Sequence, residues 1–100
     1  MLDRLTVLFR PGRPRRFDVA AAPADVLMQS AVVLRSLGAT VARLDLEAGT
    51  LEARLALGGV LRVRAEGDDD ESHVAIDVDG RDWGGVARVL AHELAEGTRG

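Results

Sequence analysis

The chain has 100 residues, a formal net charge of −3 at pH 7 and 47% hydrophobic residues, as is typical of a single soluble globular domain. The absence of cysteine excludes disulfides, thiolate metal sites and cysteine nucleophiles, and the mildly acidic total disfavours a non-specific nucleic-acid binder. The apolar run from Leu5 to Phe9 is too short for a secretory signal or a membrane span. We therefore expect one cytoplasmic domain over residues 1–100 with no membrane partner.

The first 20 residues contain two short strand-like runs, Leu5–Arg10 and Arg15–Ala20. Between them lies Pro11-Gly12-Arg13-Pro14, a sequence typical of a turn. The simplest prediction is a hairpin. The alternative is that only Arg15–Ala20 joins the sheet while the first run forms a separate, swapped arm.

A helix is predicted from Pro23 to Leu37, because proline suits the first helical position and Gly38 suits the position after the last. At 100° per residue one arc of this helix is apolar and should face the sheet. That arc consists of Val26, Leu27, Ala31, Val33, Leu34 and Leu37. Met28 and Val32 lie outside it and form a small apolar strip that we expect the sheet to leave uncovered.

Residues 39–79 show four runs in which apolar side chains occupy every second position, the period of half-buried strands. The predicted buried rows are Ala42, Leu44, Leu46; Leu51, Ala53, Leu55, Leu57; Leu61, Val63, Ala65; and Val74, Ile76, Val78. The predicted open face carries Arg43, Asp45, Glu47, Glu52, Arg54, Arg62, Arg64, Glu66, His73, Asp77 and Asp79. The pattern predicts an antiparallel meander, with an acidic hairpin turn at Gly67–Glu71.

A second helix is predicted from Trp83 to about Glu96, with Asp82 as its N-cap and a buried stripe formed by Trp83, Ala87, Leu90 and Leu94. Together the elements predict an α+β fold: a two-layer sandwich in which an antiparallel sheet of about five or six strands carries both helices on one face. The predicted order is β(β)-α-β-β-β-β-α.

This element order, with FDVAAAPADVLMQSAVVLRSLGATV as its strand–helix–strand opening, resembles small bacterial helix-grip domains and one half of the TATA-box-binding-protein fold. A bacterial origin also fits the use of arginine for all 13 basic residues, which G+C-rich codons favour. The resemblance is one of topology, and fold alone does not define function. It carries over no functional residue.

The strongest candidate binding residues are the arginines of the first hairpin, Arg10, Arg13, Arg15 and Arg16, which could contact an anion, a nucleic acid or an acidic partner. Their alternative role is to keep a sheet edge soluble. The open face of the meander mixes both signs of charge and lacks aromatic residues, which disfavours nucleic-acid binding there. Opposite charges on its neighbouring strands predict cross-strand pairs.

No metal or cofactor is expected. Asp77-Val78-Asp79-Gly80-Arg81-Asp82 resembles a calcium loop, but Arg88 stands where the bidentate glutamate should be. His73 is expected on the open face near Asp77, and Ser72 should point to the opposite face, so no nucleophile–base pair is predicted and the protein is expected not to be an enzyme.

Self-association is predicted from exposed apolar residues. The first strand is apolar on both faces, and Met28 and Val32 add a second patch, so the expected dimer contacts are Leu5, Val7, Phe9, Met28 and Val32. We therefore predict a non-enzymatic, homodimeric binding module. The alternatives are a nucleic-acid-binding protein using Arg10–Arg16 and a carrier of a small apolar ligand between helix and sheet, beside Trp83.

Overall fold

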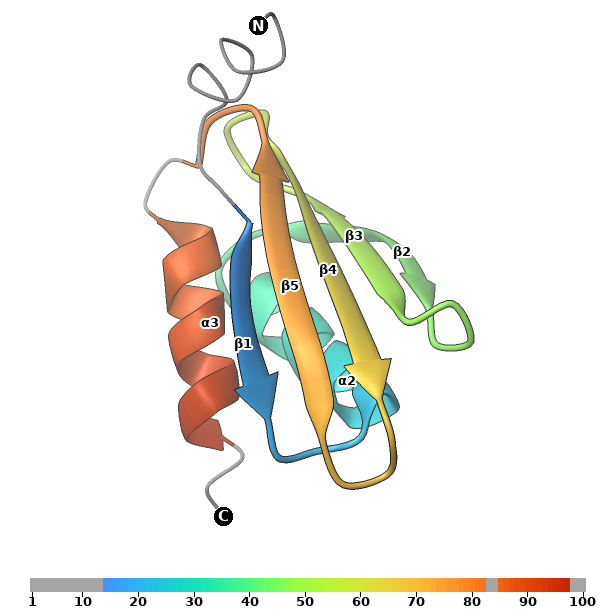
Figure 1. The fold of residues 1–100 in the computed structure, drawn as a ribbon. Helices are drawn as coiled ribbons and strands as arrows, with labels where there is room; N and C mark the ends of the chain where they lie inside the picture. The colour runs from blue at the N-terminus through green and yellow to red at the C-terminus, as the bar shows by residue number, and fades with distance from the viewer. Residues whose placement is uncertain (1–13, 83–84, 98–100) are drawn as a thin grey trace, which may run out of the picture.

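The computed structural model describes residues 14–82 and 85–97, which form five strands and two helices (Figure 1). In chain order the elements are β1 (Arg15–Val19), α2 (Pro23–Ser36), β2 (Thr40–Asp45), β3 (Thr50–Arg54), β4 (Val60–Gly67), β5 (Ser72–Asp79) and α3 (Val86–Gly97). The α+β class and the order β-α-β-β-β-β-α are confirmed. The predicted strand Leu5–Arg10 lies outside the described residues.

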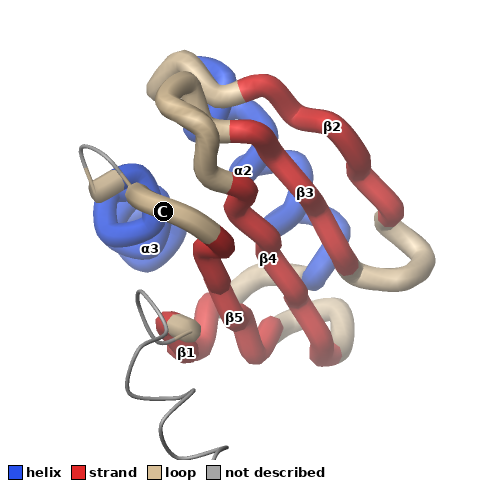
Figure 2. Tube along the Cα trace, turned by 90° about the horizontal axis from the view of Figure 1, so that it is seen from above, coloured by secondary structure: helices blue, strands red, loops and turns tan. Residues whose placement is uncertain are grey.

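The sheet is fully antiparallel with strand order β1-β5-β4-β3-β2, so the first strand of the described chain pairs with the last. Both helices lie on the same face of it (Figure 2). Helix α2 packs on β2, β3 and β4, and α3 packs on β1 and β5 while also contacting α2. Neither described helix lies on the other face of the sheet, and we call it the open face.

Helix α2 begins at Pro23, as the sequence predicts, and ends at Ser36, one residue before the predicted end at Leu37. Pro23 lies in its first turn with Asp25, and Arg35 lies in its last turn, so both charges complement the helix dipole. Five of the six predicted core residues are buried, and Leu37 is the exception because it caps the helix end and is 38% exposed. Ser30 is also buried on this side of the helix. Its hydroxyl is satisfied there because it donates a hydrogen bond to the Val26 carbonyl at 2.7 Å.

Helix α3 begins at Val86, not at the predicted Trp83. The Asp82 carboxylate accepts hydrogen bonds from the backbone N–H groups of Val86 (2.7 Å) and Ala87 (2.9 Å), so it caps the helix from four residues upstream. The intervening Gly84-Gly85 is a poor helix former, which explains the later start. The predicted stripe is confirmed at Ala87, Leu90 and Leu94, which are all buried, and Trp83 lies outside the described residues.

The predicted buried rows of β3, β4 and β5 are confirmed, the β3 row as far as Leu55. They form one core with the helices. Leu57 was predicted to extend the β3 row, but it lies in the following turn and is 71% exposed. In the β2 row, Leu44 faces the helices as predicted, but Val41 takes the place predicted for Ala42 because the register shifts between Val41 and Arg43. This β-bulge at Ala42 places Val41 and Leu44 on the helix side, opposite Ala53 and Leu51. Leu46 lies beyond the strand, in the turn.

Neither of the two described helices combines the length and apolarity needed to cross a lipid bilayer.

Candidate functional site

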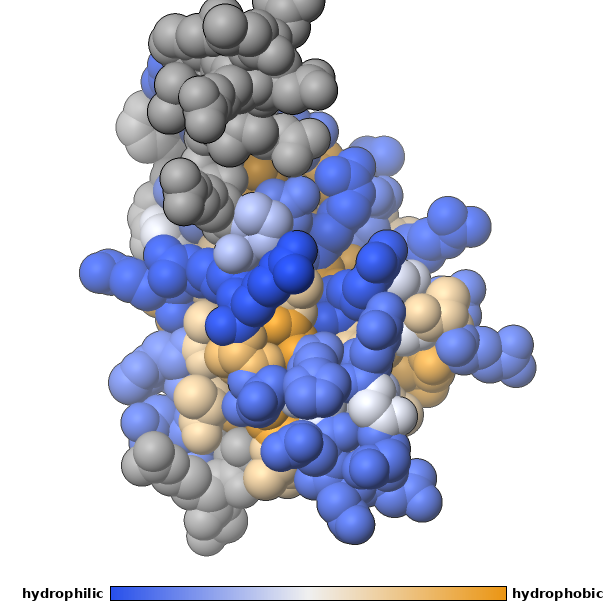
Figure 3. Space-filling view, in the orientation of Figure 1, coloured by the Kyte–Doolittle hydropathy of each residue, from blue (hydrophilic) through white to orange (hydrophobic). Residues whose placement is uncertain are grey.

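The open face of the sheet carries most of the charged side chains of the strands, and the strand register arranges them in rows across the sheet. Figure 3 looks onto this face and shows hydrophilic side chains over much of it, with apolar surface between them over β1 and β5. Because same-face residues are two apart along a strand, neighbouring rows lie about 6.6 Å apart. The residues of β3, β4 and β5 that were predicted to lie on this face do so, because their neighbours in the sequence are buried on the other face. These buried neighbours are Leu51, Ala53, Leu61, Val63, Val74 and Ile76.

One row is basic over three adjacent strands. Arg16 of β1 pairs with Ala75 of β5, Ala75 pairs with Arg64 of β4, and Arg64 pairs with Thr50 of β3. Two arginines therefore flank one methyl side chain, with a hydroxyl beside them. We call Arg16, Ala75, Arg64 and Thr50 the arginine row.

The arginine row borders two adjoining hollows in the surface. The first has a volume of about 380 Å³ and is lined by the whole row together with Arg43, Glu52, Arg62, Asp77 and other residues of the strands. The second, of about 390 Å³, lies toward His73 and shares Arg16, Arg64 and Ala75 with the first. The small side chain of Ala75 leaves room between the two arginines, so both guanidinium groups can reach a molecule seated there.

Within the described part of the chain, the guanidinium groups of this row have no hydrogen-bond or ion-pair partner. Arg62, in the next row, differs because its Nε donates to Glu52 Oε1 at 3.1 Å, which confirms the predicted cross-strand pairing of opposite charges. Arg16 and Arg64 therefore keep the hydrogen-bonding capacity of their side chains for something else, and so does Arg43, which also lines the first hollow. A planar guanidinium binds carboxylate or phosphate oxygens through paired N–H groups.

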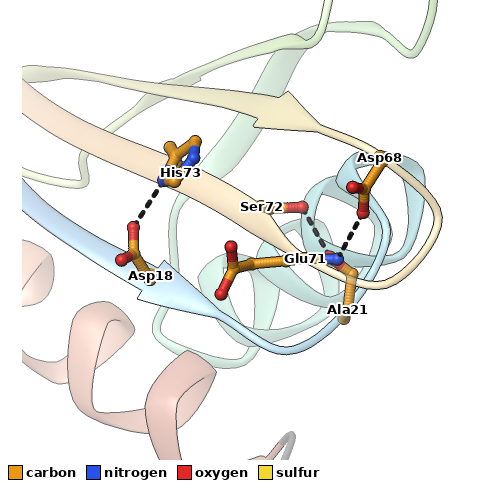
Figure 4. A network of polar contacts seen from close by, with 6 residues as sticks. All are labelled: Asp18, Ala21, Asp68, Glu71, Ser72 and His73. Atoms are coloured by element: carbon orange, nitrogen blue, oxygen red, sulfur yellow. Dashed lines mark hydrogen bonds and ion pairs between the residues drawn. The ribbon is translucent and has the colours of Figure 1, made fainter.

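His73 pairs with Asp18 of β1 and not with Asp77, the predicted neighbour. The imidazole Nδ1 and the Asp18 Oδ1 are 2.6 Å apart, across the β1–β5 pairing (Figure 4). The hydrogen bond with Asp18, and then its negative charge, raise the pKa of His73, and the carboxylates of Glu71 and Asp68 act in the same direction. Glu66 of β4 lies opposite His73 on the other side. This end of the open face is therefore acidic, and His73 is its one cationic group when protonated.

Replacing Asp18 with asparagine is expected to cost more stability at pH 5.5 than at pH 8.5. Since the folded pKa of His73 lies above its ordinary value of about 6.5, the ion pair stabilises the fold fully below that value and the gain is lost as pH rises through the folded pKa. Urea unfolding of wild type and variant at both pH values measures the difference. Asp69→Asn, in the β4–β5 turn, is the charge-matched control, and equal losses at the two pH values would contradict the assignment.

The residues next to His73 stabilise the end of the sheet and do not belong to the arginine row. Ser72 is buried on the helix side, as predicted, and its hydroxyl donates to the Ala21 carbonyl at 2.6 Å, which fixes the start of β5 to the connection before α2 (Figure 4). The Asp68 carboxylate accepts hydrogen bonds from the backbone N–H groups of Asp70 and Glu71. These bonds lower the pKa of Asp68 and stabilise the predicted acidic turn. The Ser72 hydroxyl is thus engaged away from His73.

The predicted arginine cluster is divided by the structure. Arg10 and Arg13 lie outside the described residues. Arg15 and Arg16 are neighbours in β1 and point to opposite faces, since Arg15 pairs with the buried Ile76 and Arg16 with Ala75. Of these two described arginines, only Arg16 reaches the open face. Its association with Arg64, 48 positions later in the chain, depends on the β1–β5–β4 register, which no local sequence pattern reveals.

The other predicted contacts have mixed outcomes. Met28 and Val32 are 54% and 60% exposed, which confirms the uncovered strip on α2. Leu5, Val7 and Phe9 lie outside the described residues, so the dimer itself stays a prediction. A hollow lined by Leu37, Leu55, Val86 and their neighbours has a volume of only about 70 Å³, well below the usual size of a ligand pocket. In residues 14–82 and 85–97 no three acidic or histidine side chains come together to hold a metal ion.

The chain matches no protein-family model and has no significant match among curated protein sequences.

Proposed function

We propose that the protein is a non-enzymatic binding module that takes an anionic ligand on the open face of its sheet. The observation that carries the proposal is the arginine row: Arg16 and Arg64 flank Ala75, both border the two hollows, and neither has a partner among the described residues. Guanidinium groups without a carboxylate partner, beside a hollow of small-molecule size, favour an external anion.

The surroundings support binding more than catalysis. The hydroxyl of Ser72 donates to a backbone carbonyl on the opposite side of the sheet from His73, so it lacks the hydrogen bond that would activate a nucleophile. His73 itself is held by an exposed carboxylate, Asp18. The face therefore offers fixed positive charge and hydrogen-bond donors for recognition.

The test is a titration of ¹⁵N-labelled protein with sodium phosphate and with a twelve-residue oligothymidylate, at constant ionic strength, followed by amide chemical shifts. At least one of the two anions is expected to shift the amides of Arg16, Ala75, Arg64 and Thr50. Arg64→Gln is expected to raise the Kd about tenfold or more, because it removes a charged hydrogen-bond donor.

Arg54→Gln is the matched control for this experiment. Arg54 is exposed on the same face and its loss changes the net charge equally, but it lies two rows from Arg64 and lines neither hollow. Its Kd is expected to stay within about twofold of the wild type, since only screened, long-range attraction is lost. Equal effects of the two substitutions, or shifts that avoid the arginine row, would overturn the proposal.

A further inference from the structure

Carboxylates border the arginine row on both sides along the strands. Toward the acidic turn, the next row is Asp18, His73 and Glu66. In the other direction, the next row contains Asp77, then Arg62 paired with Glu52, and it ends at Arg43 of β2. Each of these rows lies about 6.6 Å from the arginine row. A second anionic group one row away would lie beside Asp18 and Glu66 on one side, or beside Asp77 and the Arg62–Glu52 pair on the other.

The arginine row is also short in the direction across the strands. Beyond Thr50 it ends at Asp45 of β2, which pairs with Thr50 and carries the opposite charge. From Arg16 to Arg64 there are two strand spacings, which amounts to roughly 10 Å. Arg16 and Arg64 together therefore span about the width of one small molecule, and the row that holds them ends at Asp45.

A chain of phosphates does not fit this pattern of charge. Successive phosphates of a nucleic acid lie only a few ångströms apart, about 3.4 Å of helix axis per strand in duplex DNA. A strand laid over Arg16 and Arg64 would place its next charges over Asp18, Glu66, Asp77 or Asp45, and like charges in contact oppose binding. A single oxyanion over Ala75 stays in the row that has an arginine on each side, while the carboxylates lie in the adjacent rows or at the far end of this one.

We infer, on the basis of the proposed function, that the ligand is a compact anion: a small molecule whose one phosphate or carboxylate group sits over Ala75 between Arg16 and Arg64. The hollow of about 380 Å³ has the volume of a small-molecule site. The Thr50 hydroxyl supplies a further donor at the end of the row, next to Arg64. The surrounding carboxylates exclude longer polyanions.

Three probes test this inference under the conditions of the first titration: inorganic phosphate, succinate and the oligothymidylate, compared at equal concentration of anionic groups. Phosphate or succinate is expected to bind at least about tenfold more tightly per anionic group than the oligonucleotide, and the tighter of the two identifies the headgroup. Arg64→Gln should weaken that binding about tenfold, and Arg54→Gln should not.

A second variant tests the role of the carboxylates directly. Replacing Glu66 and Asp77 together with their amides is expected to strengthen oligonucleotide binding several-fold while changing phosphate binding by less than about twofold. Tighter binding of the oligonucleotide to the wild type would overturn the compact-anion inference and leave the proposed function standing. Failure of all three probes to shift the arginine row would overturn both.

Discussion

Changing Leu34 to alanine is expected to lower the free energy of unfolding by about 2–5 kcal/mol. Leu34 is fully buried where α2 packs against the sheet, so the substitution loses the burial of its side chain and leaves a cavity. Domains of this size are stable by only about 5–15 kcal/mol, and each kcal/mol changes Tm by roughly 4–8 °C. We therefore expect Tm to fall by about 10 °C or more, measured by thermal and urea unfolding.

Met28→Ala is the control for that substitution. Met28 lies in the same helix, but its side chain is 54% exposed on the side away from the sheet. Its loss is expected to change the free energy of unfolding by no more than about 0.5 kcal/mol, as is usual for surface substitutions. If the two substitutions cost the same, the assignment of the buried arc of α2 is wrong.

Gly49→Ala is expected to destabilise the fold by about 1–3 kcal/mol more than Gly38→Ala. Both glycines have positive φ, +74° and +87°, a conformation that costs a residue with a Cβ roughly 1–2 kcal/mol. At Gly38 the added Cβ meets nothing within 4 Å, but at Gly49 it would lie 2.5 Å from the carbonyl oxygen of Ala65. Overpacking of this kind costs about 1–3 kcal/mol more.

The clash at Gly49 is with backbone and so is hard to relieve. Ala65 belongs to the central strand β4, and its N–H donates to the Gly49 carbonyl at 2.9 Å, so moving either segment breaks a hydrogen bond between β4 and the β2–β3 turn. Urea unfolding of the two variants measures the difference, and Gly38→Ala serves as the control for backbone strain alone. Equal losses would show that the turn moves away from β4 without cost.

The α+β class could be predicted because it depends on local patterns. The apolar positions of β3, β4 and β5 alternate strictly, and the helix of Leu34 starts at a proline and ends before a glycine. The failures are also local in cause. The bulge at Ala42 adds a residue to β2, so Val41 and Leu44 both face the helices and strict alternation wrongly put Ala42 in the buried row.

The arginine row could not be predicted, because it depends on how distant strands align. The sequence shows that Arg16, Arg64 and Thr50 can lie on one face, but not that they share a row. A register shifted by two residues would pair Arg64 with Asp77, which carries the opposite charge, or with His73, and in either case Arg64 would leave the row of Arg16. For the same reason, the sequence placed His73 near Asp77 on its own strand and could not show its hydrogen bond with Asp18 on β1.

The pairing of β1 with β5 also determines the order in which the site can form. Strands β2 to β5 are connected by short turns, but Asp18 and His73 are 55 residues apart, so closing this pair costs more chain entropy than any turn of the meander. Arg64 can be in place before β1 docks, and Arg16 cannot. A molecule that binds both arginines therefore stabilises the docked strand by mass action. Its binding would slow amide hydrogen exchange in β1.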